Sequence, residues 1–243
     1  MRIFASFTCL FLFLSSIALA QLTLADKEQI LGTLSTDPNP ASASNMMRTF
    51  DGRFKGTKGT PFLLGVWVEG AVVTTKGKKV EGLSLHYDIE EDEIWAIRVG
   101  DPIVLNTQEI AQFTLIDLDS TIRTFYKYKI EGKKKSLESH FFEQLVPGEV
   151  ELLCRREKYF IPANSDPSGY NSHPYSEYKT RDTQFFVLRK GEDKPTKFRK
   201  AYSPVLKVLA DKKDLVKAYI QKNNLYEIDE GVLMRIFTYY NQL

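Results

Sequence analysis

The chain has 243 residues, with 33 lysines and arginines against 31 aspartates and glutamates, and a formal net charge of +2. This length is enough for one domain with a sizeable core, or at most two. Binding to nucleic acid draws on a strong basic excess, so the near-neutral charge argues against nucleic acid as the main partner.

The first residues, 1–20, are typical of a secretory signal peptide. Arg2 precedes an apolar run over 3–14, and Ala18 and Ala20 form a small-x-small cleavage site. The run is shorter than the about 20 residues of a transmembrane helix, and no later stretch is apolar enough to cross as one. We therefore expect an exported protein, periplasmic, outer-membrane-associated or extracellular, without a transmembrane helix after signal cleavage.

Removal of the signal leaves Cys154 as the one cysteine, so no intramolecular disulfide is expected. Alternation over 150–154 places Cys154 on the same strand face as Val150 and Leu152. A cysteine on such a face is typically a buried thiol that packs like a small hydrophobic residue. We therefore do not expect it to be a catalytic nucleophile.

Residues 21–49 are expected to form a short helix over 21–34 and then a linker. Pro38 and Pro40 lie there among small polar residues, a composition that does not make a packed element. The folded part is expected to begin near Phe50.

A hydrophobic period of two marks the next segment, 50–200, as a β domain. The clearest strand is 80–89, where Leu83 and Leu85 alternate with polar or small residues. Strands are expected over 62–68, 71–75, 80–89, 93–98, 102–105, 112–117, 121–130, 138–146, 149–160, 183–190 and 196–200. Short connections such as Pro147-Gly148 imply antiparallel neighbours, because a parallel crossover needs about a dozen residues or more.

The period changes to 3.6 over 201–243, which predicts helices. Ser203 before Pro204, Asp211 and Asp229 are the expected N-caps. Helices this short are not stable alone, so they must dock on the sheet or on each other. The predicted fold is α+β and mainly β: an antiparallel β-meander curled into a roll or partly open barrel, with C-terminal helices packed on the same domain.

Three segments resemble an uncharacterised family of exported β-rich proteins common in Bacteroidota. They are the F-K-G-T-K-G-T-P-F entry at 54–62, the strand-turn-strand G-L-S-L-H-Y-D-I-E-E-D-E-I at 82–94, and the helical ending from 212–225 to Tyr239-Tyr240-Asn241. The resemblance implies an exported location and one domain over most of 50–243. The family has no assigned activity, so the resemblance implies no catalytic or binding residues.

The segment 161–181 has no hydrophobic period and carries three prolines. Loops of this length are uncommon in compact domains and are either functional or disordered. Exposed aromatic side chains offer large contact areas to a ligand. Tyr170, His173, Tyr175 and Tyr178 are therefore the candidate binding residues, although packing of the loop over the sheet is the alternative.

The other polar clusters have plain structural interpretations. His86 is expected to be exposed on the polar face of a strand, and His140 to lie at the rim of the core. The acidic run 90–93 lacks the spacing of a calcium loop and is expected to be a solvated turn, so we expect no metal site and no cofactor. Lysines at 76–79 and 133–135 are expected at hairpin tips, where they keep the protein soluble or contact an anionic envelope surface.

These features favour a non-catalytic binding or interaction module of the cell envelope, which holds a partner through a sheet edge or through 161–181. Two alternatives stay open. One is a small-molecule or lipid carrier with a cavity in the rolled sheet, and the other is a hydrolase with dispersed catalytic residues.

Overall fold

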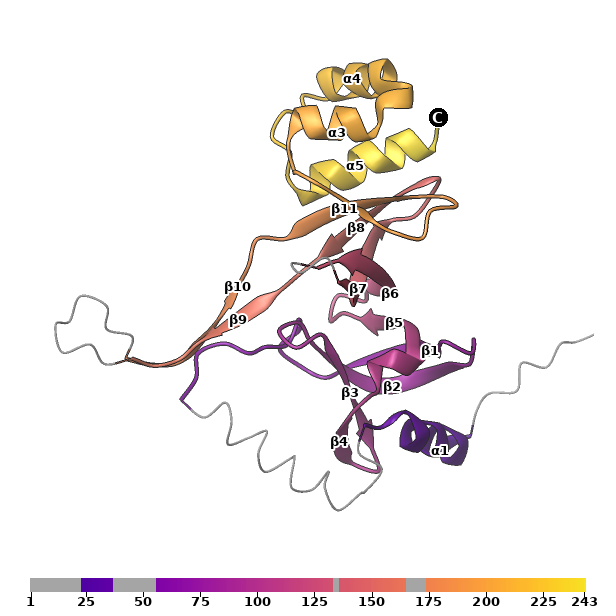
Figure 1. The fold of residues 1–243 in the computed structure, drawn as a ribbon, viewed down its shortest axis with the longest axis vertical. Coiled ribbons are helices and arrows are strands. Elements are labelled where there is room, and N and C mark those ends of the chain that lie inside the picture. The colour runs from indigo at the N-terminus through magenta and orange to yellow at the C-terminus, as the bar shows by residue number, and fades with distance from the viewer. Residues whose placement is uncertain (1–22, 37–55, 133–135, 165–173) are drawn as a thin grey trace, which may run out of the picture.

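One long antiparallel sheet organises the protein. The structure is a computed structural model that describes residues 23–36, 56–132, 136–164 and 174–243. Among these residues ten strands form a sheet in the order β12-β11-β8-β7-β6-β5-β1-β2-β3-β4, which runs from the C-terminal helices to α1 (Figure 1). Its strands are β1 (Val68–Thr74), β2 (Lys79–Asp88), β3 (Glu93–Arg98), β4 (Asp101–Val104), β5 (Ile110–Ile116), β6 (Ile122–Glu131), β7 (Leu137–Val146), β8 (Val150–Arg155), β11 (Gln184–Arg189) and β12 (Thr196–Phe198).

The predicted meander is confirmed, and its order is interrupted at one point. From β4 the chain passes through the short helix η1 (Thr107–Glu109) and re-enters the sheet as β5, beside β1 instead of β4. The outer strands β4 and β12 are not paired with each other in the described part of the chain. The sheet therefore stays open, and the predicted roll or partly open barrel is not formed, since neither a closed nor a strongly curled barrel is present among these strands.

A two-stranded arm extends from the sheet between β8 and β11. It consists of β9 (Lys158–Ile161) and β10 (Glu177–Thr180), which pair with each other and project away from the helices (Figure 1). The predicted strand 149–160 is thus divided near Arg156, and the end of the expected loop is a strand. The residue pattern of 177–180 does not predict β10, because this short strand is formed by its hydrogen bonds to β9.

Two further strand predictions need correction. The expected strands 62–68 and 71–75 are a single strand, β1, and the residues before Val68 lie outside it. Phe62 instead makes an isolated bridge to Asp88 and packs its ring against His86, with 3.7 Å between the ring centroids. Its apolar character therefore serves core packing.

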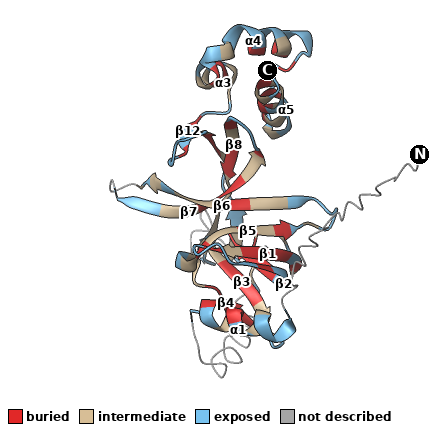
Figure 2. Ribbon diagram, turned by 90° about the vertical axis from the view of Figure 1, so that its right-hand side faces the viewer, coloured by how far each residue is buried: buried red, intermediate tan, exposed pale blue. Residues whose placement is uncertain are grey.

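The N-terminal half of the sheet packs against α1 (Leu24–Leu34), which confirms the short helix expected over 21–34. Thr23 caps this helix by accepting a hydrogen bond from the backbone N–H of Asp26 at 3.2 Å. The helix buries Ile30, Leu31 and Leu34 in the same core as Phe113 (Figure 2). The folded part therefore begins well before Phe50.

The C-terminal half of the sheet is covered by α3 (Tyr202–Val208), α4 (Lys213–Lys222) and α5 (Glu230–Asn241), with the one-turn helix η2 (Ala210–Lys212) between α3 and α4. Their apolar faces form a second core with β8, β11 and β12. The Asp229 cap is confirmed, since its carboxylate accepts from the Val232 N–H at 2.7 Å. The other two predicted caps are wrong: α3 and α4 begin after residues with no capping side chain, and Asp211 instead accepts a hydrogen bond from the Tyr240 hydroxyl at 2.6 Å.

The predicted Pro147-Gly148 turn joins β7 and β8 and contacts the end of α5. Asn241 accepts a hydrogen bond from the Val150 N–H at 3.1 Å and donates one to the Val150 carbonyl at 3.0 Å. A Cβ atom on Gly148 would lie 2.3 Å from the Asn241 side chain. Glycine is therefore required here by the close approach of the helix, as well as by the turn.

Within the described residues, no helix combines the length and the apolar character needed to cross a bilayer. The predicted signal peptide, 1–20, and the prolines of the predicted linker lie outside these residues.

Candidate functional site

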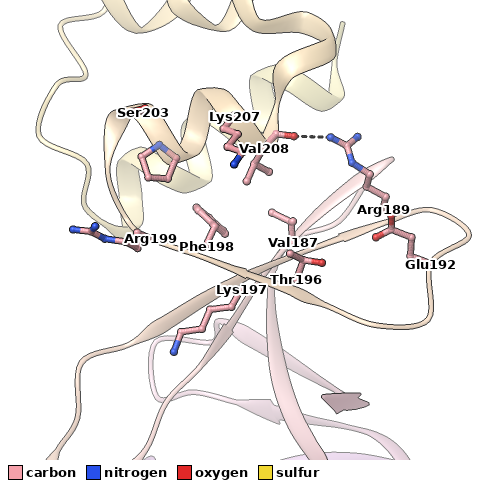
Figure 3. Close-up of a pocket in the computed structure, with 11 residues that line it drawn as sticks. Val187, Arg189, Glu192, Thr196, Lys197, Phe198, Arg199, Ser203, Lys207 and Val208 are labelled. Atoms are coloured by element: carbon pink, nitrogen blue, oxygen red, sulfur yellow. Dashed lines mark hydrogen bonds between the residues drawn. The ribbon is translucent and has the colours of Figure 1, made fainter. Parts of the chain in front are cut away.

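An open groove lies between the last sheet hairpin and the first C-terminal helix. Strands β11 and β12 form its floor and α3 its roof, and the space between them is about 750 Å³ (Figure 3). It is lined by Val187, Arg189, Glu192, Thr196, Lys197, Phe198, Arg199, Ser203, Pro204, Lys207 and Val208. We call this cavity the edge groove, because β12 is the outermost strand of the sheet.

Strand alternation and helix packing explain why the groove is apolar inside. Val187 and Phe198 project from β11 and β12 toward the helix, and the Lys197 side chain points away from it (Figure 3). Val205 and Leu206 are buried and anchor α3 in the C-terminal core. The next two residues of the helix, Lys207 and Val208, line the groove.

Arg189 connects the roof to the floor at one end of the groove. Its guanidinium donates a hydrogen bond to the Val208 carbonyl at 2.5 Å, at the end of α3. The same guanidinium lies 3.6 Å from the Asp211 carboxylate. Cations favour helix C-termini, because unpaired carbonyls carry partial negative charge there. This contact stabilises the position of α3 above the strands.

The groove and its hairpin are strongly basic. Residues 189–207 contain seven lysines and arginines and two acidic residues, whereas basic and acidic residues nearly balance over the whole chain. Arg189, Arg199 and Lys207 line the groove, Lys197 lies at its floor with its side chain directed away from α3, and Glu192 is the one acidic lining residue (Figure 3). A local field of this kind attracts acidic partners even when the net charge is small.

The two edges of the sheet differ in how they are covered. At β4, the Thr36 N–H donates to the Val104 carbonyl at 3.0 Å, and Ser35 forms a bridge with Leu105. At β12, the described residues pair on the β11 side alone. Unpaired backbone groups on an exposed edge can accept another strand, so β12 offers a docking edge, whereas the end of β4 at Val104 is already covered.

A second polar cluster surrounds His140 on β7. Its Nδ1 atom lies 3.0 Å from the Asp92 carboxylate and 3.0 Å from the Arg155 guanidinium, and its Nε2 atom lies 3.5 Å from Glu138. Asp92 also accepts a hydrogen bond from the Tyr87 hydroxyl at 2.5 Å. Burial, and then the charge of Asp92, raises the pKa of Tyr87 well above its ordinary value. His140 thus contacts two acidic groups and one basic group, and these contacts join the β2–β3 turn to β7.

A third cluster is buried between the sheet and α5. Glu143 accepts hydrogen bonds from the Arg123 side chain at 2.7 and 2.9 Å and from Arg156 Nε at 2.9 Å. Arg156 also donates to Glu230 on α5 at 2.7 Å. Burial alone would raise the pKa of Glu143, but the hydrogen bonds and charge of Arg123 and Arg156 outweigh it and lower that pKa. This network connects the helices to the centre of the sheet.

The residues chosen from the sequence as a binding loop lie elsewhere. Tyr170 and His173 fall outside the described residues. Tyr175 precedes β10 at the end of the arm farther from the ten-stranded sheet, with Lys58 Nζ 3.4 Å from its ring centroid, and Tyr178 packs on Phe160 in β9. The two described tyrosines thus make their contacts at the arm, and neither lines the edge groove.

The expected exposure of His86 is wrong, and the expected burial of Cys154 is confirmed. His86 is 5 % exposed, is stacked on Phe62, and lies 2.8 Å from the Leu64 carbonyl through Nε2. Burial lowers the pKa of His86, although the hydrogen bond to Leu64 opposes the shift. The Cys154 thiol is fully buried, and burial raises its pKa far above the ordinary value.

The expected solvated turn 90–93 is also partly wrong, because Asp92 and Glu90 are engaged in contacts. Glu90 accepts a hydrogen bond from the Phe160 N–H at 3.0 Å, which joins the turn to the arm. Lys76, Lys78 and Lys79 are exposed at the β1–β2 turn as predicted. The lysines at 133–135 lie outside the described residues.

The sequence suggested a sheet edge as one possible docking place, but it identified neither which edge nor any residue of the edge groove. One available signal was the basic excess of 189–207, which disappears when charge is summed over the whole chain. No protein-family model, curated protein or solved structure matches the chain. The fold and groove define a β-rich protein with an open, basic sheet edge, and membership of the exported family that the sequence resembles stays a prediction.

Proposed function

We propose that this chain is an exported, non-catalytic binding module that holds its partner in the edge groove. One observation carries the proposal: the outer edge of β12, which no described strand pairs, lies beside an open groove with an apolar interior and a basic edge. An extended partner can be held there by apolar contacts in the groove, by hydrogen bonds to the backbone groups on the outer edge of β12, and by the positive charge of the hairpin. The proposal of export itself is supported by the pattern of residues 1–20.

The groove supports this function better than the alternatives. A carrier of the predicted kind would enclose its ligand within the sheet, but the N-terminal core is filled by Leu85, Phe113 and Leu115, none more than 1 % exposed. A hydrolase with dispersed residues finds its best candidate in His140, whose contacts are with charged groups instead of a nucleophile.

An unbiased displayed library of peptides tests the proposal. Selected binders are expected to protect backbone amides of 196–198 from hydrogen exchange, because a partner on β12 would hydrogen-bond there. A variant that lacks 163–177 is expected to retain binding, since the described residues of this segment, 163–164 and 174–177, lie at the arm and do not line the groove.

Charge reversal provides a matched comparison. Arg199→Glu with Lys207→Glu is expected to weaken the selected binders, whereas Lys213→Glu with Lys217→Glu on exposed positions of α4 makes the same charge change outside the groove. Equal effects of the two double variants, or protection confined to the arm, would contradict the proposal.

A further inference from the structure

We infer that the occupant of the edge groove is an acidic, extended polypeptide segment of another protein, which adds to the sheet as a strand beside β12. The inference rests on the proposed function and specifies the class of partner. It follows from three features of the hairpin: its free edge, the alternation of its side chains, and its charge.

The free edge determines the backbone conformation of the partner. Strand β12 is paired with β11 through Phe185–Phe198, Phe186–Lys197 and Val187–Thr196, and the described residues place no strand on its other side. An extended segment in this position would pair its backbone with β12 and lie along the mouth of the groove. The groove is open to solvent, so an alkyl chain placed there would remain largely exposed to water.

Alternation on β12 determines the side-chain pattern of the partner. Phe198 is buried toward α3, whereas Lys197, the residue before it on β12, is exposed and points to the opposite face (Figure 3). Lys197 donates to Gln184 on that face at 2.7 Å. Arg199 follows the last residue of β12, is exposed and lines the groove. Directly opposite residues of an added strand share a face with their neighbours on β12. The partner therefore alternates apolar residues toward the groove with residues that meet Lys197, and Arg199 adds positive charge at the end of β12.

The charge of the hairpin makes those remaining residues acidic. With seven basic residues in 189–207 against two acidic ones, a second copy of this edge would meet like charges. Lysines on an edge strand are a known means of preventing edge-to-edge association. The same charges favour a strand that carries glutamate or aspartate at alternate positions, so the edge rejects copies of itself and accepts an acidic partner.

Two peptides of equal length and pattern provide the test. One alternates glutamate with valine and the other alternates lysine with valine, and both are titrated against the processed full chain by fluorescence anisotropy. We expect the glutamate peptide to bind at least about tenfold more tightly, with an affinity that falls as salt is raised. Hydrogen exchange is expected to show protection of 196–198 in that complex.

Variants separate charge from other causes. Lys197→Glu with Arg199→Glu is expected to reverse the preference toward the lysine peptide, whereas Lys213→Glu with Lys217→Glu is expected to leave it unchanged. Backbone pairing is tested with glutamate peptides that are N-methylated at alternate residues in one register or the other. One register should lose binding and the other retain it, because successive N–H groups of a strand point to opposite sides.

Several results would overturn the inference, and only some of them would also refute the proposed function. Equal affinity for both peptides, or insensitivity to N-methylation in both registers, would refute an acidic strand partner. If library-selected neutral or basic peptides nevertheless protect 196–198, the proposed function survives. Binding to phosphatidylglycerol vesicles without binding to the glutamate peptide would also overturn the inference, in favour of an anionic membrane surface. Failure of every probe to protect 196–198 would refute both proposals.

Discussion

Replacement of Glu143 by glutamine tests whether the buried charge network holds the two halves of the protein together. The side chain of Glu143 is 7 % exposed and accepts three hydrogen bonds from Arg123 and Arg156, whose side chains are 15 % and 22 % exposed. Glutamine preserves the shape but removes the negative charge. The two guanidinium groups would then face each other across a neutral amide that cannot accept all three bonds.

The expected loss follows from the burial of these groups. Breaking a buried ion pair by removal of one partner costs about 3–5 kcal/mol. Both arginines retain some contact with water, so we expect the lower end, about 3 kcal/mol at neutral pH. Domains of this kind are stable by about 5–15 kcal/mol, so the variant should still fold.

The pH dependence of this loss provides a sharper test than its size. A carboxylate whose pKa is lower in the folded state stabilises the protein above its unfolded pKa, and this contribution is lost as the pH falls through the folded value. The pKa of Glu143 is lowered from 4.5. The stability difference between wild type and Glu143→Gln should therefore be complete at neutral pH and narrow as the pH is taken below 4.5.

Urea denaturation followed by circular dichroism measures the difference at each pH. Glu149→Gln is the matched control, because Glu149 forms a 2.8 Å ion pair with Lys190 but its side chain is 69 % exposed. We expect no measurable change in the control, since exposed pairs contribute little. Equal midpoints for wild type and Glu143→Gln at neutral pH, or a difference that does not change with pH, would refute the reasoning.

Three further predictions follow from single side chains. Leu31→Ala in α1 should lower the free energy of unfolding by about 2–5 kcal/mol in urea, because Leu31 is 1 % exposed in the N-terminal core; an unchanged midpoint would show that α1 is not part of the fold. Asp229→Ala should cost about 1 kcal/mol by the same measurement, since it removes the acceptor for the Val232 N–H, and Asp229→Asn should recover most of this loss. Cys154 should not react with a thiol reagent such as DTNB in the native protein and should react fully in denaturant, because burial raises its pKa and shields it; rapid native labelling would contradict this.

Local patterns predicted most of the elements correctly. The alternation over 80–89 corresponds to β2, and the cap at Asp229 corresponds to the start of α5. These features depend on residues close together in the chain, where backbone geometry couples a pattern to a conformation. The Pro147-Gly148 turn belongs to the same class.

The errors concern residues whose environment is set by distant segments. His86 alternates like a surface residue, yet the chain before β1 folds back so that Phe62 covers its ring. Asp211 precedes a helix like a cap, but Tyr240 at the end of α5 takes up its carboxylate. In both cases a partner more than 20 residues away decides the role, and periodicity carries no information about such partners.

The sequence by itself determined most secondary-structure types, the antiparallel pairing of most consecutive strands and the apolar faces that dock the C-terminal helices, because each depends on residue order over short distances. The tertiary structure alone decided that the sheet stays open, that α1 covers one end of it, and that no described strand pairs with the outer edge of β12 beside α3. The physical reason is that a strand edge becomes free or covered through hydrogen bonds with residues remote in the chain. The edge groove exists where no described strand supplies those bonds, so it became visible when the whole sheet was assembled.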